Sequence, residues 1–116
     1  MQFGQRVRDL RQKCSLTQQE LADRLKVSVS YISKVENEKL HFGDYPSEKF
    51  IHRLAQTLEA DEDELLVLTG RVPKAIRKRV REKPHEFRRL ASVDNRTLRR
   101  IMELIDAEID DRKTMQ

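Results

Sequence analysis

The chain has 116 residues, with 24 basic and 20 acidic side chains, and 38% of its residues are charged. Its longest aliphatic run, residues 65–68, is too short for a membrane span or a signal peptide, and we expect neither. The single cysteine, Cys14, excludes an intrachain disulfide and fits a reducing cytoplasm. Helix-favouring residues dominate, and no alternating β-branched run indicates a strand. We therefore expect an all-α protein in the cytoplasm.

The first three predicted helices lie in the first third of the chain. Apolar residues at helical spacing predict the first helix over 3–13. Thr17 and Glu20 form the T-x-x-E capping-box pattern, which indicates the start of a second helix. Ser28 is expected to cap a third helix directly after a turn at 26–27. Two short helices joined by a tight turn make a helix-turn-helix.

Two more predicted helices complete this region. Ser47 is expected to cap the fourth helix. The inward face of that helix has helical spacing and comprises Phe50, Ile51, Leu54, Ala55 and Leu58. Asp61 and Glu64 repeat the capping-box pattern before a fifth helix, which ends at Gly70. Five helices can close one small core, so residues 1–70 are expected to form one domain.

The composition changes after the fifth helix. Residues 1–70 carry ten basic and twelve acidic side chains, whereas residues 71–93 carry nine basic and two acidic ones. The basic segment is predicted to contain a short helix that Pro84 breaks. It could add phosphate contacts on DNA, or it could be a solvated linker helix. Residues 94–116 are predicted to form one further helix, capped by Asp94.

The last predicted helix carries a narrow apolar stripe. Its members are Leu98, Ile101, Met102, Ile105 and Ile109, with a heptad-like 4-3-4 spacing. A helix of about 20 residues is marginal alone in water, so the stripe needs a cover. The helix could fold back onto the core through Phe87 and Leu90, or it could pair with a second subunit. We expect a homodimer, in which the same helix of the second subunit covers the stripe.

The third predicted helix presents short side chains opposite its apolar face. The presented set comprises Val29, Ser30, Ser33 and Lys34. Serine hydroxyls can bond base edges, lysine can donate to guanine, and valine can touch a thymine methyl group. Gln18 begins the second helix, where a phosphate is favoured, and Asn37 and Lys39 follow the third helix. This pattern predicts a helix that reads double-stranded DNA in the major groove.

Three segments together resemble the lambda-repressor/Cro (XRE) helix-turn-helix family. They are T-Q-Q-E-L-A-D-R-L at 17–25, V-S-V-S-Y-I-S-K-V-E-N at 27–37 and P-S-E-K-F-I-H-R-L-A-Q-T-L at 46–58. The resemblance covers residues 3–69 and implies a five-helix DNA-binding domain. It also implies sequence-specific operator binding, usually as a dimer, with repression as the commonest outcome.

The resemblance also implies roles for particular residues. It places base contacts at Val29, Ser30 and Lys34, with Ser33 beside them. It places phosphate contacts at Gln18, Asn37 and Tyr31, and we also expect them at Ser28 and Lys39, which flank the third helix. Arg11 and Glu36 match a structural ion pair, so Glu36 is expected to serve folding rather than chemistry.

The chain departs from the family pattern at three places. Lys26 and Glu38 stand where the family often has glycine, which predicts strain if either residue needs a positive φ. The stretch from 37 to 46 is also longer than the common pattern by about four residues. Its loop residues His41, Phe42 and Tyr45 could reach the DNA flank or pack, and we favour packing.

No catalytic constellation is visible in the sequence. His41, His52 and His85 are scattered, and neither metal-ligand spacing nor a glycine-rich phosphate loop occurs. We expect no enzyme, no metal and no cofactor. The main rival is an antitoxin or protein-interaction adaptor with the same fold, whose main partner is another protein. RNA binding is a weaker rival, because aromatic residues that could stack on bases are few.

Overall fold

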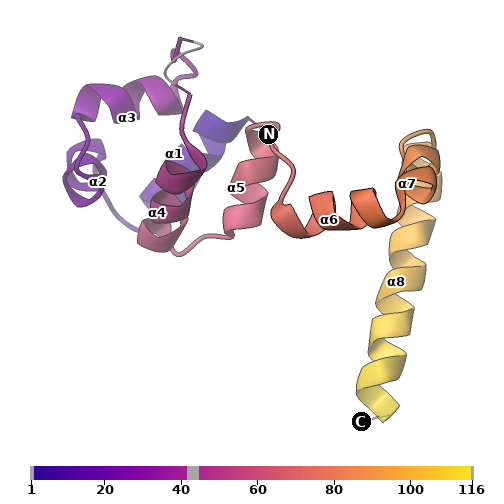
Figure 1. The fold of residues 1–116 in the computed structure, drawn as a ribbon. Coiled ribbons are helices and arrows are strands. Elements are labelled where there is room, and N and C mark those ends of the chain that lie inside the picture. The colour runs from indigo at the N-terminus through magenta and orange to yellow at the C-terminus, as the bar shows by residue number, and fades with distance from the viewer. Residues whose placement is uncertain (1, 42–44, 116) are drawn as a thin grey trace. The chain divides into compact units, whose positions relative to one another are not determined.

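The computed structural model describes residues 2–41 and 45–115, and its regular elements there are all α-helices (Figure 1). They are α1 (Phe3–Lys13), α2 (Gln18–Leu25), α3 (Val29–Glu36), α4 (Glu48–Leu58), α5 (Glu62–Leu68), α6 (Lys74–Glu82), α7 (Pro84–Leu90) and α8 (Asn95–Met115). The expected all-α fold class is confirmed. Contacts group the chain into two units, Met1–Pro73 and Lys74–Gln116. No helix in the described part of the chain is long and apolar enough to cross a membrane.

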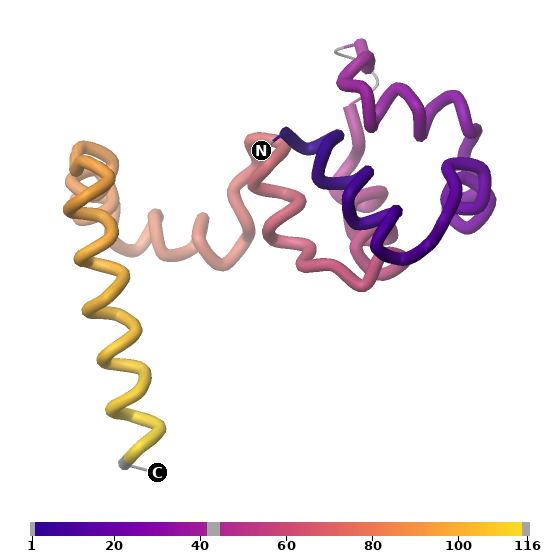
Figure 2. Tube along the Cα trace, turned by 180° about the vertical axis from the view of Figure 1, so that it is seen from behind, coloured from indigo at the N-terminus to yellow at the C-terminus, as the bar shows by residue number. Residues whose placement is uncertain are grey.

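The first unit packs α1 to α5 around one hydrophobic core. The tube in Figure 2 shows α1 running between α3 and α5, and α1 contacts α3 directly. The buried core comprises Phe3, Val7, Leu10, Leu16, Leu21, Ala22, Leu25, Ile32, Val35, Phe50, Ile51, Leu54, Ala55, Leu58 and Leu65. The predicted inward face of α4 is buried in full. Cys14 is half-buried against this core, and its thiol donates to the Leu58 carbonyl oxygen at 3.4 Å.

The helices of the first unit begin at the residues that the sequence predicts. The hydroxyl of Thr17 accepts from the Glu20 amide at 3.1 Å, and the Thr17 amide donates to the Glu20 carboxylate at 3.0 Å. Both halves of that capping box are therefore present. Ser28 and Ser47 each accept from the amide three residues further on, at 3.0 Å. These caps fix where α2, α3 and α4 start.

The second predicted capping box is wrong in one half. Asp61 accepts from the amides of Asp63 and Glu64, at 2.9 and 3.4 Å. The Glu64 carboxylate instead accepts from the Arg6 guanidinium at 2.5 Å. A charged partner on α1 outweighs the local amide, because hydrogen bonds between charged groups are stronger than neutral ones.

Lys26 and Glu38 both adopt the left-handed conformation that the family's glycines suggest. Their φ angles are 58° and 56°. Glu38 has a second role, because its carboxylate accepts from the Gly4 amide at 2.5 Å. Gln2, which precedes α1, makes no side-chain cap. Glu38 therefore stabilises the first turn of α1, where a negative charge is favoured by the helix dipole.

The second unit contains α6, α7 and α8. Pro84 ends α6 and occupies the first turn of α7, where its missing N–H costs nothing. Asp94 accepts from the Thr97 amide at 2.8 Å, which confirms the predicted cap of α8. Ile101 lies beside Leu90 and Val93, and all three line a cavity of about 380 Å³.

The close approach of α1 to the end of α3 depends on Gly4. A Cβ at this position would lie 2.4 Å from the Val35 carbonyl oxygen and 2.7 Å from that of Glu36. We predict that Gly4→Ala lowers the free energy of unfolding by about 1–3 kcal/mol, measured by urea denaturation, since backbone atoms cannot yield as a side chain would.

Gly70→Ala is the matched control for steric crowding. Nothing lies within 4 Å of its added Cβ, so this variant carries the strain of φ +82° alone. A Gly4→Ala protein as stable as the wild type would contradict the close approach.

Candidate nucleic-acid interface

Helix α3 has one buried face and one exposed face. Ile32 and Val35 are 1% and 2% exposed, and they lie in the core. On the other side, Ser30 and Lys34 are exposed. Val29 is 39% exposed, whereas Ser33 is half-buried. The structure thus brings the four predicted base-contacting residues together on one helix surface. A helix with this distribution can lie in a groove while its other side stays packed.

The turn between α2 and α3 is held by backbone and side-chain hydrogen bonds. Lys26 caps α2 in the left-handed conformation, and the Val27 amide donates to the Ala22 carbonyl oxygen at 3.0 Å. Arg53 of α4 donates to the Leu25 carbonyl oxygen from outside the motif. The turn therefore satisfies the last carbonyls of α2 while it sets the direction of α3.

A buried carboxylate, Glu36, anchors the last turn of α3. Its side chain is 0% exposed. Arg11 of α1 donates to both of its oxygens, at 2.6 and 3.0 Å. Gln18 of α2 donates at 3.1 Å, and Arg8 donates at 3.5 Å. Three helices are therefore tied to one side chain, and the implied Arg11–Glu36 ion pair is formed.

The surroundings of Glu36 set its ionisation. Burial alone would raise the pKa of its carboxyl group, because a low dielectric disfavours the charged form. The hydrogen bonds from Arg11 and Gln18, together with the charge of Arg11 and the bond from Arg8, act in the opposite sense. They prevail, so the pKa of Glu36 lies below its ordinary value of 4.5. The carboxylate stays charged in the folded protein at neutral pH.

Four of the expected phosphate-contacting residues already have partners inside the unit, including Ser28, whose hydroxyl caps α3. The Gln18 amide group is bonded to Glu36. Asn37 accepts from Arg8 at 2.6 Å, and it donates to the backbone oxygen of Ser33 at 2.8 Å. The ring of Tyr31 meets that of Phe50 edge to face, with centroids 5.4 Å apart. Ser28 and Lys39 are exposed.

Sequence reasoning missed Arg8, which links Glu36 to Asn37. It lies three residues before Arg11, so the two guanidinium groups share one face of α1. That spacing was the available signal. The spacing indicates that Arg8 and Arg11 share a partner. It does not identify that partner as Glu36, which lies 28 residues after Arg8 and is brought there by the fold.

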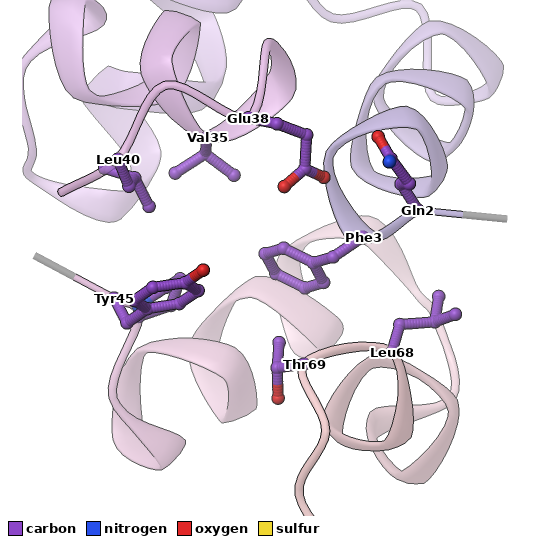
Figure 3. A pocket seen from close by; sticks show the side chains of 9 residues that line it. Gln2, Phe3, Val35, Glu38, Leu40, Tyr45, Leu68 and Thr69 are labelled. Atoms are coloured by element: carbon purple, nitrogen blue, oxygen red, sulfur yellow. The ribbon is translucent and has the colours of Figure 1, made fainter. Parts of the chain in front are cut away.

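Leu40 and Tyr45, on either side of residues 42–44, help to line a cavity of about 300 Å³. Figure 3 shows the Phe3 ring pointing into it, with Tyr45 and Glu38 directed towards Phe3. Tyr45 is 57% exposed, and His41 is exposed as well. Phe42 lies outside the described residues, so its expected packing stays a prediction.

The described residues include no group of three or more His, Cys, Asp or Glu side chains that could hold a metal ion. His52 has a structural partner, the Glu62 carboxylate, at 2.6 Å from its Nδ1. This pair joins α4 to α5, so it serves the fold of the first unit.

A core that holds α2 and leaves one face of α3 exposed is the architecture of a DNA-binding regulator. Residues 2–68, more than half of the chain, match a family model described as a helix-turn-helix domain. The chain therefore belongs to the helix-turn-helix family, and its fold is of the lambda-repressor/Cro type. Proteins of this family are DNA-binding transcriptional regulators rather than enzymes.

Most of the chain is also similar to a solved structure. The match is to a chain of the SinR protein/SinI protein complex, with a TM-score of 0.53 and 21% sequence identity. It covers 93% of this chain and 98% of that chain. At this identity, the likeness shows the fold, including the helices after the first unit. No curated protein sequence matches the chain.

The ion pair at Glu36 predicts a defined pH dependence of stability. Because its pKa is lower in the folded chain, its stabilising effect is complete above the ordinary value of 4.5. The effect is lost as the pH falls through the lowered value. We predict that Glu36→Gln lowers the free energy of unfolding by about 3–5 kcal/mol at pH 7, because Arg11 loses its buried partner.

The difference between wild type and Glu36→Gln should shrink as the pH is lowered below 4.5, which urea denaturation at several pH values measures. Glu59→Gln, at an exposed carboxylate of the first unit, is the control for the loss of one carboxylate. A difference that stays constant down to the acid limit would contradict the ionised pair.

Proposed function

We propose that this protein is a dimeric repressor that reads a palindromic DNA operator through residues 28–37. The observation that carries the proposal is the exposed surface of α3, whose Ser30 and Lys34 face away from a fully packed side. The fixed backbone of α3 would present the same side chains to every operator. Preorganisation of this kind lowers the entropy lost on binding.

The proposed readout is direct but limited. Ser30 and Ser33 can bond either type of base edge, and Lys34 can donate to the acceptors of guanine. Val29 can contact a thymine methyl group. The surface has no arginine or glutamine fork for bidentate pairing, so DNA shape would supply part of the discrimination.

The proposed phosphate contacts flank α3. Ser28 and Lys39 offer exposed side chains, whereas Gln18 would contribute its backbone N–H at the start of α2. Asn37 and Tyr31 would contact the backbone of DNA in addition to their partners inside the unit. The exposed basic residues of α6 would add sequence-independent attraction, which weakens with salt.

The dimer would form through α8. The stripe members Leu98, Met102, Ile105 and Ile109 are each between 43% and 48% exposed. Apolar surface arranged along one line of a helix is stabilised when a second helix covers it. Two subunits would place two copies of α3 on the two half-sites of one operator.

A second candidate is a regulator whose main role is to bind a partner protein. A chain of the SinR protein/SinI protein complex resembles this one along nearly its whole length. That chain is part of a complex of two proteins, which favours this second candidate. The α8 stripe would then meet a different chain. Such an adaptor predicts no salt-dependent DNA affinity, whereas a repressor requires it.

The readout by α3 can be tested by changes in sequence preference. We predict that Ser30→Ala and Lys34→Ala each reduce the preference for one base pair, the one that the replaced side chain contacts. The binding free energy for the preferred site should weaken by about 1–3 kcal/mol in each variant. Selection of binding sites from random DNA, followed by titration of the selected site, measures this change.

Lys13→Ala is the matched control, because Lys13 is an exposed lysine at the far end of α1 beside α4. The DNA sequence preference of the Lys13→Ala variant should equal that of the wild type. Unchanged preference in both Ser30→Ala and Lys34→Ala would refute the assignment of α3 as the reading surface.

The dimer can be tested by placing a charge in the stripe. We predict that Ile105→Lys shifts the sedimentation mass from dimer to monomer, since the charge would be buried between two helices. Ala107→Lys places the same charge on the opposite face of α8 and should leave a dimer. A wild-type monomer, or a dimer in both variants, would contradict the role of α8.

A further inference from the structure

The charges of α8 are segregated along its length. Its first eight residues contain three basic side chains and no acidic one, namely Arg96, Arg99 and Arg100. Residues 103–111 contain five acidic side chains and no basic one, namely Glu103, Asp106, Glu108, Asp110 and Asp111. The helix therefore has a positive first half and a negative second half, with two further basic residues in its last turn. The apolar stripe crosses both halves.

The segregated charges distinguish between two ways of covering the stripe with a second α8. In a parallel pair, the basic halves lie side by side and so do the acidic halves. In an antiparallel pair, each basic half faces an acidic half, and the twofold axis produces this twice. Like charges repel and opposite charges attract at these distances, and antiparallel helix dipoles add a favourable interaction.

The register of the stripe agrees with the antiparallel arrangement. Its centre lies between residues 103 and 104, so alignment about that point sets Leu98 against Ile109 and Met102 against Ile105 of the second copy. All four residues then meet apolar partners.

The same alignment brings Arg99 close to Asp106 of the second copy. A parallel pair offers cross-helix attraction only near its ends, between Glu108 and Lys113 and between Asp94 and Arg99. The Asp94 carboxylate is already occupied as the cap of α8. These contacts do not offset the two pairs of like-charged halves.

We infer that α8 pairs with α8 of a second copy in antiparallel orientation, with Leu98 of one copy facing Ile109 of the other. The inference rests on the proposed dimer and specifies its geometry. The exposed line of apolar residues requires a cover, and the charge pattern selects a second, inverted copy of the same helix as that cover. The surface is a self-complementary interface, as a twofold dimer requires.

Disulfide trapping distinguishes the two orientations. The full-length Cys14→Ala protein has no cysteine, so Leu98→Cys and Ile109→Cys each introduce one thiol into it. One of the two proteins carries an affinity tag, so that a mixed dimer has its own size on a non-reducing gel. Circular dichroism confirms that both variants fold. Ala107→Cys, on the opposite face of α8, gives the background of random collisions.

The expected result is a disulfide in the mixture of the two variants and only background levels in each variant alone. In the antiparallel pair, two thiols at position 98 are about 16 Å apart along the helix axis. A disulfide needs Cα atoms no more than about 7 Å apart, so such a pair cannot close. The parallel pair gives the opposite result, with disulfides in each variant alone.

The other outcomes separate this inference from the proposed function. Disulfides within each variant alone would overturn the orientation and leave the dimer standing. A monomeric wild type in sedimentation, or no disulfide above the Ala107→Cys background, would overturn the pairing of α8 altogether. Operator binding is measured separately on the same proteins. Mixed disulfides in a protein that binds no DNA would support the pairing and refute the repressor.

Discussion

The buried carboxylate of Glu36 is the constraint on which the position of α3 depends. A charge whose side chain is fully withdrawn from water is costly unless it is paired and hydrogen-bonded. Arg11 and Gln18 can satisfy it only if α1 and α2 hold their observed places against α3. Arg11 also donates to the Leu16 carbonyl oxygen at 2.8 Å, so the connection between α1 and α2 is fixed by the same guanidinium. The exposed face of α3 takes its direction from this cluster.

A second constraint acts on the same end of α3 through the backbone. Gly4 allows α1 to approach the carbonyl oxygens of Val35 and Glu36. The Glu38 carboxylate holds the same two elements together by accepting from the Gly4 amide. Glu38 adopts a left-handed conformation that is unfavourable for a side chain of its kind. Its bond to the first turn of α1 offsets that strain. Polar pairing and close packing therefore restrain one helix end from two sides.

The sequence predicts those features whose partners are close along the chain. The caps at Thr17, Ser28 and Ser47 are confirmed. They could be predicted because each hydroxyl bonds an amide only three residues away. The division into helices follows for the same reason, since a 3.6-residue period is a local property. The exposed face of α3 could also be predicted, because its buried side has helical spacing.

Features that depend on distant partners could not be predicted in this way. Glu64 was expected to complete a local capping box, but it bonds Arg6, 58 residues earlier in the chain. The partner that Gln18 finds in Glu36 is likewise set by the fold. The resemblance to a family supplied the Arg11–Glu36 pair, but it gave no role to Arg8. Pairwise contacts across the core require the packed arrangement of the helices, which periodicity alone does not contain.

The two exposed faces of the chain differ in chemistry, and the difference suggests a division of work. The outer side of α3 is short and polar, so each half-site would receive few contacts, and the discrimination per base pair would be modest. The stripe of α8 is apolar and long, which suits stable association. When two subunits are joined, the second half-site is bound as an intramolecular step, and weak contacts at two sites reinforce each other. The proposed reading surface lacks arginine and glutamine forks, so it would depend on a firm dimer more than a surface with strong bidentate contacts would.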